Sequence, residues 1–116
     1  MTRLDLARLD DITDAIVTIR SHASRGPLSD GLVMDAVRIR LLEIGEAVKG
    51  LSPTLTALEP DIPWRQIARM RDQLAHHYFA TLPEVIQNTV EHDLEPLENA
   101  VARMRPAATE APEDAQ

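Results

Sequence analysis

The sequence lacks cysteine, long apolar runs and an apolar leader, and each absence excludes a class of protein. Without cysteine, the chain can form neither a disulfide framework nor a thiolate metal site. No apolar run approaches the roughly eighteen residues that a membrane-spanning helix needs. The first residues are charged and lack the apolar core of a secretory signal. We therefore expect a cytoplasmic protein with no membrane partner.

Basic residues are fewer than acidic ones, so the 116 residues carry a formal net charge of -7. This charge argues against wrapping of nucleic acid on a broad basic surface, so any such contact must be local. The length suits one hydrophobic core. We expect a single helical domain over residues 1–105. Beyond Met104 the chain has no apolar residue larger than alanine, so residues 106–116 are expected to form a disordered acidic tail.

Apolar residues recur at helical spacing along most of the chain, and no long window alternates with the period of a strand. The pattern predicts an all-α fold, an antiparallel bundle of four main helices. Gly50 is expected to end the second helix as a left-handed cap, and Pro96 to kink or break the last one near residues 92–96. The four helices are expected at about residues 4–22, 30–49, 61–79 and 81–104.

The third predicted helix concentrates the chemistry, because it carries every aromatic residue of the chain and is locally basic. Steps of three and four residues place Arg71 in an otherwise apolar stripe. A guanidinium there is costly unless it is paired or faces a cleft. The aromatic residues are Trp64, Tyr78 and Phe79, and the basic ones are Arg65, Arg69, Arg71, His76 and His77.

Helical geometry separates the reactive groups of this segment. Arg71 and Tyr78 are seven residues apart and share a face, whereas His76 points about 140° away from Arg71. They can converge on one ligand only if the helix end distorts or if two copies face each other in a dimer. Asp72 precedes His76 by four residues and could fix its tautomer.

An arginine, an orientable histidine and a tyrosine suit a metal-free ribonuclease. The 2′-hydroxyl of RNA must lose a proton, the 5′ oxygen must gain one, and the phosphorane's added charge must be stabilised. A histidine such as His76 can transfer both protons, and Arg71 can bind the non-bridging oxygens through two donors. Tyr78 can stack on a base or hold a phosphate oxygen.

Arg71, His76 and Tyr78 form the pattern R-x-x-x-x-H-x-Y, which resembles the motif of the HEPN superfamily. The surrounding sequence is similar to its HepT-like branch over roughly residues 4–103. The supporting segments are Ile44-Gly45-Glu46-Ala47, Ile62-Pro63-Trp64-Arg65 and Asp93-Leu94-Glu95-Pro96-Leu97.

The resemblance implies a homodimeric toxin that cleaves RNA without a metal or other cofactor, with Arg71 and His76 as catalytic residues. It also implies a cognate minimal nucleotidyltransferase as antitoxin, which transfers AMP to Tyr78. The sequence departs from the family pattern where Asp72 replaces a frequent asparagine and Gln87 a frequent tryptophan. Asp72 adds negative charge beside the expected phosphate site. His77 stands among the candidate site residues without an assigned role.

Simpler interpretations stay open at this point. Arg71 could form a structural ion pair with a carboxylate such as Glu46, and His76 could cap the helix end. A metal site at His76 and His77 is disfavoured, because adjacent histidines project in different directions from a helix. At the level of the whole protein, the rivals are a catalytically inactive helical partner of a nucleotidyltransferase and a structural dimerisation bundle.

Overall fold

The computed structural model describes residues 3–76 and 83–110, and every regular element in these ranges is helical. The all-α prediction is confirmed. Two short elements add to the four main helices: α3 lies in a segment expected to be a loop, and a π-helical turn, η2, lies between α5 and α6. The elements are α1 (Arg3–Ala23), α2 (Gly31–Lys49), α3 (Pro53–Thr56), α4 (Trp64–His76), α5 (Pro83–Asn88), η2 (Thr89–Asp93) and α6 (Leu94–Glu110).

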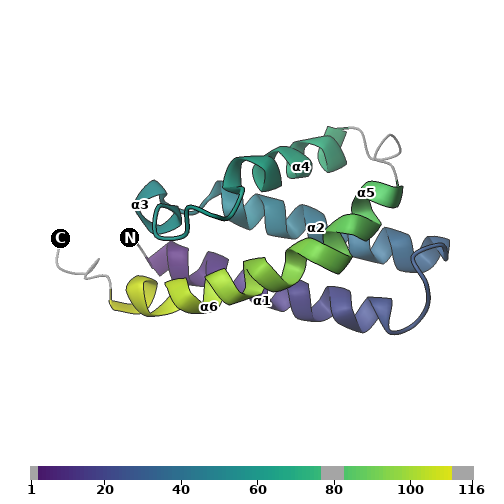
Figure 1. The fold of residues 1–116 in the computed structure, drawn as a ribbon, viewed down its shortest axis with the longest axis horizontal. Helices are drawn as coiled ribbons and strands as arrows, with labels where there is room; N and C mark the ends of the chain where they lie inside the picture. The colour runs from purple at the N-terminus through teal and green to yellow at the C-terminus, as the bar shows by residue number, and fades with distance from the viewer. Residues whose placement is uncertain (1–2, 77–82, 111–116) are drawn as a thin grey trace.

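The main helices alternate in direction, so the fold is an antiparallel bundle (Figure 1). α1 and α2 form a helical hairpin, α4 packs on α2, and α6 packs on α1. Helix α4 therefore contacts the rest of the bundle mainly through α2. Within the described ranges, no helix has the length and apolarity required to cross a membrane.

The core is built from the apolar stripes that the sequence indicates. In α1 the residues Leu9, Ile12, Ile16 and Ile19 are fully buried. They meet apolar residues of α2 and α6, among them Val37, Leu41, Ile44, Leu97 and Val101. Some large apolar residues in the first turns of their helices are exposed instead: Leu4, Leu32 and Val85.

A buried carboxylate fixes the start of α1 against the segment that follows α2. Asp5 is only 1% exposed. It accepts hydrogen bonds from the backbone N–H of Ser52 at 2.9 Å and from the Ser52 hydroxyl at 2.8 Å. The Ser52 side chain thus bonds to Asp5, while Pro53 occupies the first turn of α3. This contact sets where the chain leaves α2 on its way to α4.

The ends of α2 confirm both predicted bounds and correct the predicted conformation of Gly50. Asp30 caps the N-terminus, and its carboxylate accepts from the Leu32 N–H at 2.9 Å. Gly50 does follow the helix, but its φ of -91° is right-handed, so the expected left-handed cap is wrong. The Arg8 guanidinium lies against Gly50, so a Cβ at this position would displace that side chain.

The last helix breaks close to Pro96, as predicted. The π-helical segment η2 ends at Asp93, and Pro96 lies in the first turn of α6. Because proline has no N–H, the carbonyl four residues earlier loses its α-helical partner, and a wider turn accommodates the mismatch. The expectation of disorder from residue 106 is wrong for 106–110. α6 continues to Glu110 because alanine favours helix and Ala108 packs into the core.

Candidate functional site

The candidate site is built on α4, which is oriented at its start by Trp64. The carbonyl of Pro63 accepts from the N–H groups of Gln66 and Ile67, which opens the first helical turn. The half-buried indole of Trp64 donates to the carbonyls of Thr56 at 3.1 Å and Glu59 at 3.0 Å. The indole therefore ties α4 to the preceding loop as well as to the core.

Gly45 lets α4 approach α2 at the position of the motif arginine. A Cβ built on Gly45 would collide with Cβ of Arg71, and it would lie 3.1 Å from the Arg71 Cα. Gly45 is buried in the middle of α2, where alanine would be the better helix former. The glycine is explained by this contact between the two helices, which places Arg71 beside the last turns of α2.

Two ion pairs cross from α2 to α4 around Arg71. The Nε of Arg71 donates to Glu46 Oε2 at 2.5 Å, and Lys49 Nζ donates to Asp72 Oδ1 at 2.9 Å. A longer contact of 3.3 Å joins Arg71 Nη1 to the same Asp72 oxygen. The four side chains alternate in charge, so Arg71 lies within a locally neutral network.

Pairing within the network shifts the pKa values of Arg71 and Asp72, in each case in favour of the charged form. The hydrogen bond to Glu46 raises the pKa of Arg71, and Asp72 adds to this effect. The hydrogen bond from Lys49, followed by the contact with Arg71, lowers the pKa of Asp72 below its ordinary value. Asp72 is therefore a carboxylate at neutral pH. The Arg71 side chain remains 26% exposed, so an anion can reach it from solvent.

The other predicted site residues are brought together only in part. His76 is exposed and is the last residue of α4. Tyr78 and His77 lie outside the described residues, so the structure does not test their predicted roles. The carboxylate of Asp72 is held by Lys49 and Arg71, and the described ranges contain no hydrogen bond between Asp72 and His76. A hydrogen bond from His76 to Asp72 would therefore have to compete with the bonds from Lys49 and Arg71.

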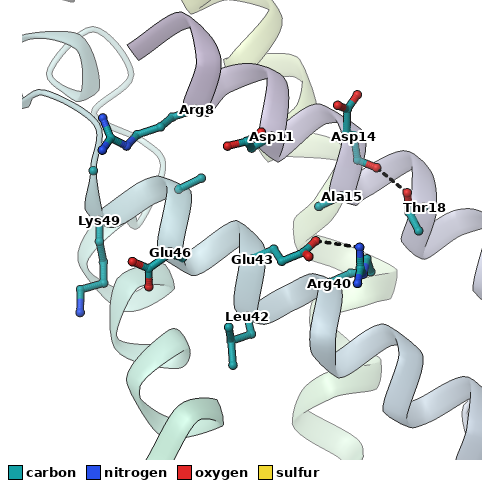
Figure 2. Close-up of a pocket in the computed structure, with 12 residues that line it drawn as sticks. Arg8, Asp11, Asp14, Ala15, Thr18, Arg40, Leu42, Glu43, Glu46 and Lys49 are labelled. Atoms are coloured by element: carbon teal, nitrogen blue, oxygen red, sulfur yellow. Dashed lines mark hydrogen bonds and ion pairs between the residues drawn. The ribbon is translucent and has the colours of Figure 1, made fainter. Parts of the chain in front are cut away.

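Two hollows adjoin this region. A groove of about 600 Å³ lies between α1 and α2, and Glu46 and Lys49 belong to its lining (Figure 2). The groove carries both signs of charge, with Arg8 and Arg40 near Asp11 and Glu43. A smaller cavity of about 150 Å³ lies among α2, α4 and the η2 segment, and it is mostly apolar. Because Glu46 and Lys49 line the charged groove and also pair with Arg71 and Asp72, the groove borders the network around Arg71.

Lys49 is the site residue that sequence reasoning missed. It follows Glu46 by three residues, so the two share a face at the end of α2. That spacing was visible in the sequence, but the partner of Lys49 could not be identified before α2 and α4 were placed together. Glu46 was considered only as a structural partner of Arg71, and the structure confirms that this pair exists.

The comparisons with known proteins identify the family of the chain. The family model described as "Ribonuclease HepT-like" matches residues 8–104. The chain belongs to the HepT-like ribonuclease family. A relative from Thermococcus cleftensis, named "Probable ribonuclease HepT", is 38% identical over 101 residues, which cover 84% of this chain and 92% of the relative. No solved structure matches the chain significantly.

Two further relatives carry the name "Putative RNase" and match shorter parts of the chain. The one from Methanocaldococcus jannaschii is 42% identical over 79 residues, or 64% of each protein. The one from Caldanaerobacter subterraneus is 39% identical over 70 residues, or 60% of this chain and 62% of the relative. The segment that the family model matches includes Arg71 and His76.

Proposed function

We propose that this HepT-like protein is a metal-independent endoribonuclease that acts as a homodimer and serves as the toxin of a toxin–antitoxin pair. The observation that carries the proposal is the setting of Arg71. Its guanidinium is held at Nε by Glu46 at 2.5 Å and yet remains partly exposed. A fixed, solvent-accessible guanidinium is suited to bind the non-bridging oxygens of a phosphodiester.

The proposed reaction is an intramolecular transesterification of RNA. A histidine removes the proton of the 2′-hydroxyl, and the 2′ oxygen attacks phosphorus. The bond from phosphorus to the 5′ oxygen breaks, and that oxygen takes up a proton as it leaves. The products are a 2′,3′-cyclic phosphate and a free 5′-hydroxyl. His76 supplies the proton transfers, and Arg71 stabilises the additional charge on the phosphorane.

The positions of Arg71 and His76 favour a dimer. Arg71 is turned toward α2, whereas His76 is exposed at the end of α4. One copy of α4 therefore presents the two groups in different directions. A second copy facing the first could bring the histidine of one protomer near the arginine of the other. Symmetric dimers are the commonest protein assemblies, and their interfaces pair identical surfaces.

A cleavage assay in the presence of a chelator tests the nuclease. The wild type is expected to cut single-stranded RNA, whereas His76→Ala and Arg71→Ala should reduce the rate by at least a hundredfold. His92→Ala is the matched control, because His92 is also an exposed histidine but lies in η2. Equal loss in the control would contradict the assignment of His76 and Arg71. Intact RNA with the wild type would contradict the nuclease and favour an inactive partner of a nucleotidyltransferase.

The antitoxin part of the proposal places AMP on Tyr78. Transfer of an adenylate would add a charged, bulky group beside the motif and so block access of RNA. Mass spectrometry after co-expression with a neighbouring minimal nucleotidyltransferase should show one or more added adenylates. The same measurement on Tyr78→Phe should show none. A modification that persists in Tyr78→Phe would contradict the assignment of this acceptor.

A further inference from the structure

Asp72 poses a problem for a site that binds a phosphodiester. It follows the motif arginine directly, and its lowered pKa keeps it charged at neutral pH. A carboxylate at this place repels the substrate and also competes with it for the guanidinium. The structure shows a second cation at the same carboxylate oxygen, because Lys49 Nζ lies 2.9 Å from Asp72 Oδ1.

Lys49 is placed to compensate for this charge. It is the only lysine in the sequence, it ends α2, and Glu46 one turn earlier binds the adjacent Arg71. Figure 2 shows both side chains leaving the last turns of α2. The two ion pairs between α2 and α4 therefore have opposite polarity. In one, α2 supplies the anion Glu46 to Arg71, and in the other it supplies the cation Lys49 to Asp72.

We propose that Lys49 is a positioning residue for RNA cleavage, whose ammonium neutralises Asp72 and thereby leaves the Arg71 guanidinium to a phosphodiester oxygen. The two contacts of Asp72 Oδ1 support this ordering, since Lys49 approaches to 2.9 Å and Arg71 only to 3.3 Å. The shorter distance is typical of a charge-assisted hydrogen bond, and the longer one lies beyond that range. This inference rests on the proposed nuclease function.

Loss of Lys49 has two consequences that weaken substrate binding. Asp72 keeps its charge without its shorter partner, so it repels the incoming phosphate. The long contact with Arg71 Nη1 can then tighten to about 2.8 Å, which occupies a donor that the substrate needs. Both effects operate through Asp72, so they should disappear when Asp72 is made neutral.

A double-mutant cycle tests this dependence with a single-stranded oligoribonucleotide as the probe. Lys49→Gln is expected to lower kcat/KM about fivefold, mainly through KM, which corresponds to about 1 kcal/mol for an exposed pair. Asp72→Asn removes the carboxylate that Lys49 neutralises, and its own kcat/KM is the reference for the second half of the cycle. In the Asp72→Asn background, Lys49→Gln should have little further effect.

Arg20→Gln provides the matched control. It removes the cation of another exposed ion pair, with Glu98 at 2.8 Å, on the helices α1 and α6. It should leave kcat/KM unchanged. An equal loss from Lys49→Gln in both backgrounds would overturn the proposal, because it would make Lys49 a direct ligand of RNA. An unchanged KM in Lys49→Gln would overturn it as well.

A second measurement is independent of cleavage. Reductive methylation with ¹³C-formaldehyde labels the one lysine and the terminal amine and keeps their charges. The Lys49 signal should move in Asp72→Asn and stay in place in Asp30→Asn, which alters the opposite end of α2. A signal unaffected by Asp72→Asn would overturn the pair itself. If the signal responds but the wild type leaves RNA intact, the proposed function fails and Lys49 loses its role in cleavage.

Discussion

The close contact between Gly45 and Arg71 gives the most direct test of how the fold positions the site. A methyl group on Gly45 would overlap Cβ of Arg71 and would lie 3.1 Å from its Cα and 3.2 Å from its Cγ. Because the obstacle includes backbone, rotation of the arginine side chain cannot relieve it. Gly45→Ala must therefore push α4 away from α2.

The magnitude follows from two opposed effects. Overpacking of a close contact costs about 1–3 kcal/mol, and the better helix propensity of alanine returns up to about 1 kcal/mol. We expect Gly45→Ala to lose about 1–2 kcal/mol of stability. For a chain of this size, that loss lowers Tm by about 4–10 °C. Cleavage should fall more than tenfold at a temperature where the variant is fully folded, because the pair between Arg71 and Glu46 is displaced.

Gly31→Ala is the matched control, since nothing lies within 4 Å of the equivalent added Cβ and Gly31 also belongs to α2. Its Tm should equal or exceed that of the wild type. Thermal melting followed by circular dichroism, with RNA cleavage measured on the same samples, separates the two glycines. The reasoning is refuted if Gly45→Ala melts at or above the wild-type temperature and keeps full activity.

Three further predictions concern the charged groups that hold the helices together. Glu46→Gln should lower the cleavage rate several-fold while Tm, measured by circular dichroism, stays within a few degrees, because exposed pairs contribute at most about 1 kcal/mol; an unchanged rate would show that Arg71 needs no such partner. Asp5→Ala leaves two partly buried donors of Ser52 without their buried acceptor and should cost about 1–3 kcal/mol in a denaturant titration, whereas Asp11→Ala on the exposed side of α1 should cost little. Arg103 lowers the pKa of Glu59 from 4.5, so this pair stabilises the fold above that pH and loses its effect as the pH falls through the lowered value. Glu59→Gln should therefore flatten the stability loss below about pH 4.5, and an acid titration identical to that of the wild type would contradict the assignment.

The sequence predicts the helices well because their signals are local. Leu9, Ile12 and Ile16 recur at helical spacing and are buried, and Asp30 caps α2 as its type suggests. Pro96 indicates the break in the last helix, although not its π-helical form. These features depend on a few neighbouring residues, so they can be read before the tertiary fold is known.

The errors arise where contacts distant in sequence decide the outcome. Gly50 looks like a left-handed cap, but its φ of -91° is right-handed, and its nearest non-local neighbour is the Arg8 side chain of another helix. The alanines after Met104 look too small for a core, but Ala108 is buried in it. The Lys49 partner lies 23 residues away in the sequence, and nothing local identifies it. In the site, the pair between Arg71 and Glu46 could be anticipated, whereas the pair between Lys49 and Asp72 could not.

The charge arrangement on α4 explains how an acidic protein can present a surface to RNA. The helix carries three arginines and one carboxylate, while the whole chain has a net charge of -7. Arg65 and Arg69 are exposed, and the single carboxylate, Asp72, is bound by Lys49 from α2. Asp11 and Asp14 of α1 instead line the groove between α1 and α2 (Figure 2). Because salt screens exposed charges beyond about 8–10 Å, an RNA phosphate near Arg71 senses mainly α4 and the end of α2. Overall charge is therefore a poor guide to substrate in this fold, and the local balance set by Lys49 decides whether Arg71 can bind an anion.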